Sequence, residues 1–573
     1  MSYLLSALSL IGFYSIAKKI SYISFKDKNN IIINIFTFLL IFFFIYIVNT
    51  YLFLLKISSQ FFSIGIFSIS LVLGLLFLIK NISKIYSFFK KEFYSKTILM
   101  TLSCFFILSH LMPTDEDSIR YHLEIPQKII DGTFYQNHWL DYLVIGSNEF
   151  INLFGIHLGF YNTSSILNFS CLVFIILSNN YFFKKKNIGS AWLGHTLILS
   201  SPYIIPLIGS QKLFLLPSYI SAYTIAYLYI FKKDISYKSI LLIVAINIFS
   251  VSTKPIFLPY LAIVLFFATF VIRFNFKEKI FILIFSFVIL LVALFPLALI
   301  KYKIYQDPFL PIISINKLNS EWWNVYNKEF LTAWQMDVTD SFLKIYQILL
   351  IPIKLILPLH PSDLFKCLGL GMFFLYFLDF KKNKNLIFFI ILFVLSVLIL
   401  GNYQSRWFLP LLLLVGIFAK EIKFKILNNL VKLQLLFSLA ILIPLAFAII
   451  FPNLFNFNDL VFSQKKIIDT MNTKYKDQRY FTNHNSFFYF KNEIPMYMHE
   501  KQILARQDRK FFKKNSEVKL FLYQVRSGES FEQFSKKNLN CNSFKILEKF
   551  NYNSRRFFLV DDKSEVILYK QLC

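Results

Sequence analysis

The amino-acid sequence predicts an all-α polytopic membrane protein of about 12–14 transmembrane helices, followed by a small C-terminal α/β domain outside the membrane. Two observations support this prediction. The chain has 573 residues, of which 56% are hydrophobic and only 16% are charged. Its apolar runs approach or exceed the roughly 20 residues that a helix needs to cross the hydrocarbon core of a bilayer. A soluble enzyme of this size would not carry such runs through three-quarters of its length.

Apolar segments recur through residues 1–451, which we expect to form the transmembrane domain. They lie at 3–17, 31–55, 60–79, 97–112, 162–180, 190–208, 213–231, 239–253, 256–272, 280–300, 364–380, 386–402, 405–419 and 429–451. The stretch 342–358 is also apolar, but Pro352 and Pro358 interrupt it. If it spanned the membrane, the lysines that follow would lie outside. We therefore expect an interfacial or re-entrant helix there.

The basic residues predict the orientation of these segments. Alternate connections carry clusters of lysine and arginine at 18–28, 80–96, 184–186, 232–238, 273–279, 381–384 and 420–425. The opposite short connections carry little more than Lys56, Lys212, Lys254 and Arg406. Because cytoplasmic loops carry the excess of basic residues, the clustered side is expected to be cytoplasmic. The loops 113–161 and 301–341 and the tail after residue 451 then face outward.

The last part of the chain, residues 452–573, changes in character. The alternating runs VKLFLYQV (518–525) and RFFLVDDKSEVILYK (556–570) are typical of β-strands, and a helical stretch lies between them. We expect a small extracytoplasmic α/β domain.

The formal net charge of +28 does not indicate a nucleic-acid partner. The lysines lie in short clusters between apolar runs, and neither one face nor one tail collects them. The expected partner is the lipid of the membrane itself.

The loop TDEDSIRYHLEIPQKIIDG, residues 114–132, carries the most informative residues. Asp115, Glu116 and Asp117 follow a hydrophobic run, and acidic groups at the edge of a bilayer are usually functional. Apolar residues then recur at helical spacing as far as Gly132, which predicts a helix along the outer interface. An alternative role for Asp115 or Asp117 is the N-cap of this helix, for which aspartate is preferred.

This loop resembles a known family. Asp117-Ser118-Ile119-Arg120-Tyr121-His122-Leu123 looks like the first outer loop of GT-C glycosyltransferases, in particular the bacterial branch with a D-S-x-x-Y-H-L signature. It is similar also to the aspartate–tyrosine spacing of lipid A aminoarabinose transferases and protein mannosyltransferases. The adjacent Asp-Glu pair of the family occurs here as Asp115-Glu116, two residues too early for that spacing. Which acid matches the family's aspartate is therefore open.

Three shorter motifs extend the resemblance downstream. Tyr305-Gln306-Asp307-Pro308-Phe309-Leu310-Pro311 is similar to a G-N-P-x-x-P turn, with Asp307 in place of the usual asparagine. Ser405-Arg406-Trp407-Phe408-Leu409-Pro410 resembles the R-x-x-L-P start of a late span, and Ser252-Thr253-Lys254 a lysine at the outer end of a middle span. The resemblance implies a GT-C-like fold in the bacterial inner membrane. It also implies transfer of a sugar from a polyprenyl-phosphate donor to a lipid, glycan or protein acceptor.

The resemblance and the residue chemistry together suggest roles. Asp117, supported by Asp115, would act as general base on the acceptor hydroxyl in a direct inverting displacement. Lys254 and Arg406 would stabilise the charge on the departing lipid phosphate. The other candidate substrate-binding residues are Glu116, Tyr121, His122, Glu149 and Asp307.

Each of these roles has a simpler alternative. Lys254 could extend its ammonium to the interface, Arg406 could be an interface anchor, and His122 could pack within the loop. Trp322, Trp323, Tyr326 and Trp334 in the second long loop could stack on a sugar or belong to the aromatic belt of the membrane. No cofactor is expected, and three adjacent acids would permit a divalent metal, but no His or Cys ligand spacing supports one.

Two other function classes compete with a transferase. A transporter or flippase of lipid-linked sugars would place polar groups or broken helices near mid-bilayer, often in duplicated halves. The ionisable residues lie mostly at predicted helix ends instead, and no duplicated half is visible in the sequence. A polysaccharide polymerase or ligase would share the lipid-linked substrate.

Overall fold

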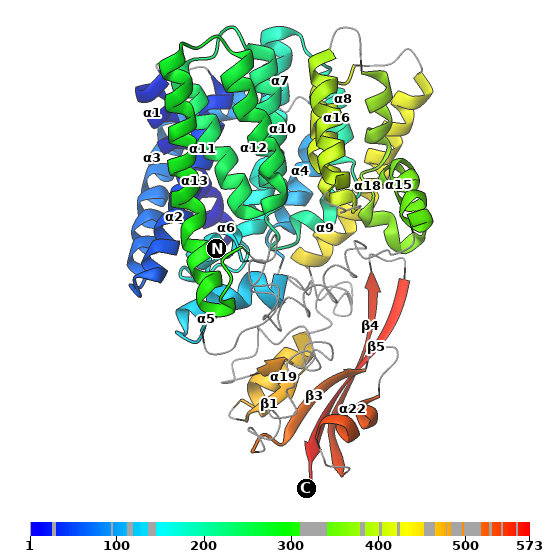
Figure 1. Ribbon diagram of the computed structural model, residues 1–573. Helices are drawn as coiled ribbons and strands as arrows, with labels where there is room; N and C mark the ends of the chain where they lie inside the picture. Colours follow the sequence, from blue (N-terminus) through cyan, green and yellow to red (C-terminus); the bar gives the residue numbers. More distant parts are fainter. Residues whose placement is uncertain are drawn as a thin grey trace.

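The computed structural model describes most of the chain as a helical bundle with a small β-sheet at one end (Figure 1). The described residues are 2–25, 30–92, 95–111, 118–135, 145–309, 341–378, 384–399, 404–420, 425–451, 465–476, 478–482, 495–497, 517–525, 530–539, 543–556 and 560–572.

The N-terminal half of the bundle runs from α1 to α13. Its α-helices are α1 (Ser2–Phe25), α2 (Ile31–Leu54), α3 (Gln60–Glu92), α4 (Lys96–Leu108), α5 (Glu124–Ile130), α6 (Ser147–Ile156), α7 (Thr163–Lys186), α8 (Ala191–Leu199), α9 (Ile204–Ile208), α10 (Leu215–Phe231), α11 (Tyr237–Thr253), α12 (Leu258–Phe266) and α13 (Phe276–Tyr305). Short π- or 3₁₀-helices precede α5 (η1, Ser118–Leu123) and flank α12 (η3, Pro255–Phe257; η4, Phe267–Val271).

The C-terminal half of the bundle contains α15 (Ser341–Ile356), the 3₁₀-helices η6 (Pro361–Lys366) and η7 (Leu370–Phe377), α16 (Lys384–Ile399), η8 (Ser405–Phe408), α17 (Leu409–Phe418) and α18 (Lys425–Ile450). The predicted interfacial or re-entrant segment 342–358 is α15, and Pro352 lies inside this helix.

The composition and length of these helices are those of an integral membrane protein. Six described helices are long and apolar enough to cross a membrane, and five more apolar helices have 10–17 residues. The helix surfaces fit this setting. Only 17% of the apolar stretch of α3 and 28% of that of α13 are buried inside the protein, so these helices expose apolar side chains that lipid can cover. The prediction of a mostly α-helical membrane protein with a C-terminal sheet is confirmed.

Two predicted segments are wrong in detail. The described part of segment 364–380 is not one helix but falls within η6 and η7, because Gly369 between them adopts a left-handed φ of +86°. Segment 190–208 is split into α8 and α9, because Pro202 disfavours a helical conformation at Ser201, the residue before it. Neither segment therefore crosses the bundle as a single straight α-helix.

The two ends of the bundle differ in composition. At one end the last turn of α7 contributes Lys186, which pairs with Asp234 in the connection between α10 and α11. Lys238, on α11, donates to the backbone oxygen of Ser24 near the end of α1. Three of the lysine-rich connections therefore meet at this end. The opposite end of α7, about 36 Å away for 24 residues, lies among polar residues.

The C-terminal sheet has five strands in the order β2-β1-β3-β5-β4. They are β1 (Tyr480–Thr482), β2 (Pro495–Tyr497), β3 (Leu520–Val525), β4 (Phe544–Arg556) and β5 (Val560–Gln571). β1 pairs in parallel with β2 and β3, whereas β5 pairs antiparallel with β3 and β4. The predicted strands at 518–525 and 556–570 correspond mainly to β3 and β5.

The two faces of the sheet are covered by different helices. Alternate strand residues such as Leu520 and Leu522 pack with Ile467 and Met471 of α19 (Lys465–Lys474). The residue between them, Phe521, lies on the other face with Phe531 of α22 (Phe531–Asn538). Strand periodicity of two thus gives the sheet two apolar faces, each with its own helix. The sheet lies at the same end of the bundle as α5 and α6 (Figure 1).

Candidate functional site

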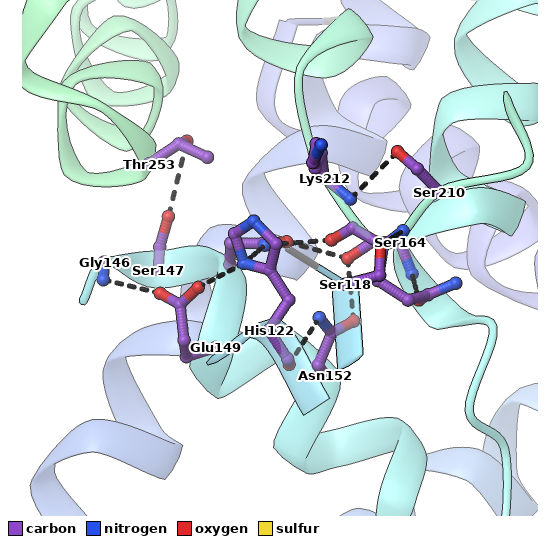
Figure 2. A network of polar contacts seen from close by, with 12 residues as sticks. Ser118, His122, Gly146, Ser147, Glu149, Asn152, Ser164, Ser210, Lys212 and Thr253 are labelled. Carbon is purple, nitrogen blue, oxygen red and sulfur yellow. Dashed lines mark hydrogen bonds and ion pairs between the residues drawn. The ribbon is translucent and has the colours of Figure 1, made fainter. Parts of the chain in front are cut away.

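The candidate site is a buried polar network at the end of the bundle where α5 and α6 lie. It is built from segments far apart in the sequence (Figure 2). It begins at Ser118, the first described residue after the acidic triplet. Ser118 is fully buried, and its Oγ accepts a hydrogen bond of 2.6 Å from the backbone nitrogen of Gln211. η1 and α5 follow, and the chain then turns at Gly132 with φ of +69°. The predicted helix in this loop and its glycine stop are confirmed.

His122 and Glu149 form the centre of the network. Both side chains are buried, with 2% and 1% exposure, and His122 Nδ1 lies 2.5 Å from Glu149 Oε1. The second carboxylate oxygen, Oε2, accepts a hydrogen bond of 2.6 Å from the backbone nitrogen of Gly146. This contact caps the backbone nitrogen of Gly146 at the start of α6, where a carboxylate is favoured by the helix dipole. Both oxygens of Glu149 therefore contact the protein itself.

Amide and hydroxyl groups surround this pair. Asn148 Nδ2 lies 2.6 Å from His122 Nδ1 and 3.0 Å from the backbone oxygen of Gln211. Asn152 Nδ2 donates to the backbone oxygen of His122 at 3.1 Å. Ser164 Oγ, at the start of α7, lies 2.7 Å from Oδ1 of both asparagines. Because these groups are buried and hydrogen-bonded to one another, they hold η1 rigidly against α6 and α7.

The end of α11 approaches the network closely. Ser147 Oγ donates to Thr253 Oγ1 at 3.3 Å. A Cβ atom on Gly146 would lie 2.7 Å from the backbone oxygen of Ser252 and 2.8 Å from that of Thr253. Only glycine permits this approach, although its φ of −149° would suit any residue. The contact puts Lys254, the C-cap of α11, immediately beside the start of α6.

The end of α13 adds a buried cation. Lys301 is only 8% exposed and interacts electrostatically with Glu149. Asp307 follows shortly after the helix end; it is fully buried, and its Oδ1 accepts a hydrogen bond of 3.1 Å from the backbone nitrogen of Phe309. Asp307 therefore stabilises the local turn after α13.

Arg406 is positioned by the aromatic residue that follows it. Its guanidinium carbon lies 5.1 Å from the ring centroid of Trp407, within cation–π range. Trp407 packs edge-to-face with Phe214, at 5.0 Å between centroids, close to Gln211 in the sequence. Among the described residues, the buried Nε of Arg406 has no hydrogen-bond partner. η8 therefore starts α17 beside the segment that anchors Ser118.

The structure places the predicted residues unevenly. Asp115, Glu116 and Asp117 lie outside the described residues, as do the four aromatic residues of the second loop. His122 and Glu149 are in direct contact, and the Tyr121 ring is half-buried, with its centroid 4.2 Å from that of His122. Among the described residues, no group of three or more His, Cys, Asp or Glu side chains is arranged to hold a metal ion.

Sequence reasoning missed other members of the network. Lys301 could have been found, because a lysine in the last turns of a long apolar helix is costly in a membrane and often functional. The sequence does not indicate that the other members belong to this network, because single polar residues in or beside apolar runs have no diagnostic spacing. They are Asn148, Asn152, Ser164 and Gln211.

The fold and the site define a mostly α-helical integral membrane protein with a buried polar network at one end of its bundle. Comparison with protein families identifies its relatives. Residues 75–471 match the DUF1420 N-terminal domain, so the chain belongs to the DUF1420 family. Neither the curated proteins nor the solved structures contain a match.

Proposed function

We propose that this protein is a membrane-embedded glycosyltransferase of GT-C type. It moves a sugar from a polyprenyl-phosphate carrier to a lipid, glycan or protein acceptor. The reaction takes place at the outer face of a bacterial inner membrane, on the side that carries the C-terminal sheet.

One observation carries the proposal. Directly after the acidic triplet the chain enters a buried, hydrogen-bonded network. In it η1 is held by α6 and by the segment before α10, and α6 is held in turn by α7. Groups that perform chemistry must be held within a fraction of an ångström, and a rigid second layer of contacts is the usual means. A loop that served only to connect two spans would not need such anchoring.

The chemistry that we propose is a single displacement. The acceptor hydroxyl gives its proton to the carboxylate of Asp117, and its oxygen forms a bond to the anomeric carbon. The bond from that carbon to the phosphate oxygen breaks at the same time, and the electron pair leaves with the polyprenyl phosphate. Asp115 supports the base, and Glu116, Tyr121 and Asp307 belong to the substrate-binding surroundings.

Cations around the network suit a phosphate leaving group. Lys254 lies at the end of α11, beside the start of α6, and Lys301 lies at the end of α13. Arg406, with its buried Nε and its contact to Trp407, is a third candidate. Fixed positive groups stabilise the negative charge that develops as the carrier departs, and they need no reorganisation to do so.

Purified protein in liposomes tests the proposal against its alternatives. A radiolabelled polyprenyl-phosphate sugar is supplied with membrane lipids and envelope glycans as acceptors. Label that appears on an acceptor supports a transferase. Donor that crosses the bilayer without losing its sugar would mean a flippase or transporter. Growth of repeating units on one carrier would mean a polymerase or ligase.

A further inference from the structure

We propose that Glu149 is a positioning residue that acts through His122. Its carboxylate accepts from Nδ1–H and stabilises the doubly protonated imidazolium, so that Nε2–H can donate to a phosphate oxygen of the lipid carrier. Lys301 balances the charge of Glu149 and adds to the attraction for the phosphate. This inference rests on the proposed function, since it gives the carrier phosphate as the ligand.

The geometry of the ring supports the assignment of the proton. Nδ1 lies 2.5 Å from the Glu149 carboxylate and 2.6 Å from the Asn148 amide nitrogen, and it has room for only one hydrogen. An ionised carboxylate is the stronger partner for that N–H. The Asn148 amide has other partners in Gln211 and Ser164. The bond to Glu149 therefore holds a proton on Nδ1 and fixes the orientation of the ring.

The other ring nitrogen faces away from Glu149. Figure 2 shows the ring edge that carries Nε2 turned toward the side of the network where Thr253 and Lys212 are drawn. On that side Thr253 directly precedes Lys254 in the chain. A group bound there would contact Nε2 while Nδ1 stays on the carboxylate.

The charges of the buried groups favour an anionic ligand. Glu149 carries one negative charge, whereas Lys301 and the protonated form of His122 each carry one positive charge. The negative charge of Glu149 is therefore balanced by Lys301 within the protein, and a protonated His122 can pair with a phosphate oxygen. A hydrogen bond from a charged imidazole to phosphate would also be stronger than one between neutral groups.

Capping of α6 alone does not explain the arrangement. Glu278 makes the same contact from a carboxylate to the N-cap backbone at the start of α13, where it accepts from the backbone nitrogen of Asn275 at 3.0 Å. Glu278 and Asn275 are partly or fully exposed. Glu149 makes the same kind of cap through Oε2 but is buried, and its other oxygen, Oε1, contacts His122. Glu278 is therefore a matched control for the capping role.

The test measures binding of a polyprenyl phosphate without sugar to the full-length protein in nanodiscs. Wild type, Glu149→Gln, His122→Ala, the double variant and Glu278→Gln are compared. We expect His122→Ala and Glu149→Gln each to weaken binding about tenfold, as the loss of a charge-assisted hydrogen bond would. The double variant should bind as His122→Ala does, because Glu149 acts only through the ring. Glu278→Gln should bind as wild type.

A spectroscopic measurement distinguishes positioning from folding. In ¹⁵N-histidine-labelled protein, the signals that disappear in His122→Gln belong to this ring. They should move in Glu149→Gln and stay in place in Glu278→Gln. His122→Gln also replaces the alanine variant in the binding cycle if the latter fails to fold.

Three results would overturn the inference. The first is that Glu149→Gln weakens binding by the same factor in the wild-type protein and in the His122→Ala variant. Glu149 would then have only its role as the cap of α6. The second is wild-type affinity in both single variants. The third is no binding of polyprenyl phosphate by the wild-type protein. By contrast, normal carrier binding without any sugar transfer would refute the proposed function and leave the positioning role of Glu149 standing.

Discussion

Replacing Gly146 by alanine should loosen the contact between α6 and α11 on which the candidate site is built. The new Cβ would lie 2.7 and 2.8 Å from two backbone oxygens of α11. Both distances are shorter than 3.0 Å, the shortest contact that real Cβ atoms normally make. Because these neighbours are backbone atoms, the helices must separate by roughly half an ångström, and overpacking of this kind costs about 1–3 kcal/mol. The φ of −149° is open to alanine, so the effect is steric.

Thermal unfolding of the purified protein in detergent would measure this loss, which we expect as a fall in Tm of a few degrees. Sugar transfer should fall further, by about 100-fold, because displacement of a positioned group by a fraction of an ångström to 1 Å is costly in catalysis. Gly65→Ala on α3 is the matched control, since nothing lies within 4 Å of its Cβ position. It should leave Tm unchanged or raise it slightly. A wild-type Tm for Gly146→Ala would refute the close packing of α6 on α11.

Further variants test other parts of the structure. Ser164→Ala should destabilise the bundle by about 1–3 kcal/mol in denaturant unfolding, because it leaves a buried amide oxygen without its donor; unchanged stability would contradict the network. Burial lowers the pKa of His157 below its usual 6.5, so the unfolded chain binds a proton first and stability is lost as pH falls from about 6.5 through the folded pKa. His157→Gln should therefore lose less Tm than wild type between pH 7 and pH 5, whereas an identical pH profile would contradict this. Phe531→Ala, which removes the ring stacked at 3.9 Å on Tyr569, should cost about 3–5 kcal/mol and expose the C-terminal sheet to limited proteolysis before the bundle is cut; simultaneous cleavage of both parts would speak against an independently packed sheet.

Much of the fold could be predicted from hydropathy and strand alternation. Segments 31–55 and 239–253 agree closely with α2 and α11, since apolar runs with polar ends leave little choice for their bounds. The strand at 518–525 follows from the alternation that gives the sheet its two faces. The break between η6 and η7 depends on the φ of Gly369, which hydropathy does not reveal.

The candidate site could be predicted only in part. The motif around His122 and the position of Glu149 pointed to the loop that contributes to this network. Their direct contact, however, joins residues 27 positions apart in the sequence. Pairing of this kind depends on how α6 packs against η1, which local spacing does not specify. Lys301 reaches the same place from the end of a 30-residue helix. No local spacing in the sequence connects Lys301 with Glu149.

The role of Asp117 in catalysis is tested by the rate of sugar transfer by Asp117→Asn protein in liposomes, measured beside Asp131→Asn. Asp131 lies in the same loop, is exposed, and accepts a hydrogen bond of 2.9 Å from Gln127, so its replacement controls for loop charge. We expect Asp117→Asn protein to insert and fold normally but to transfer sugar at least 100-fold more slowly than wild type, as expected for loss of a general base. Asp131→Asn should remain near the wild-type rate. A wild-type rate for Asp117→Asn would contradict the general-base role of Asp117 and with it the proposed displacement.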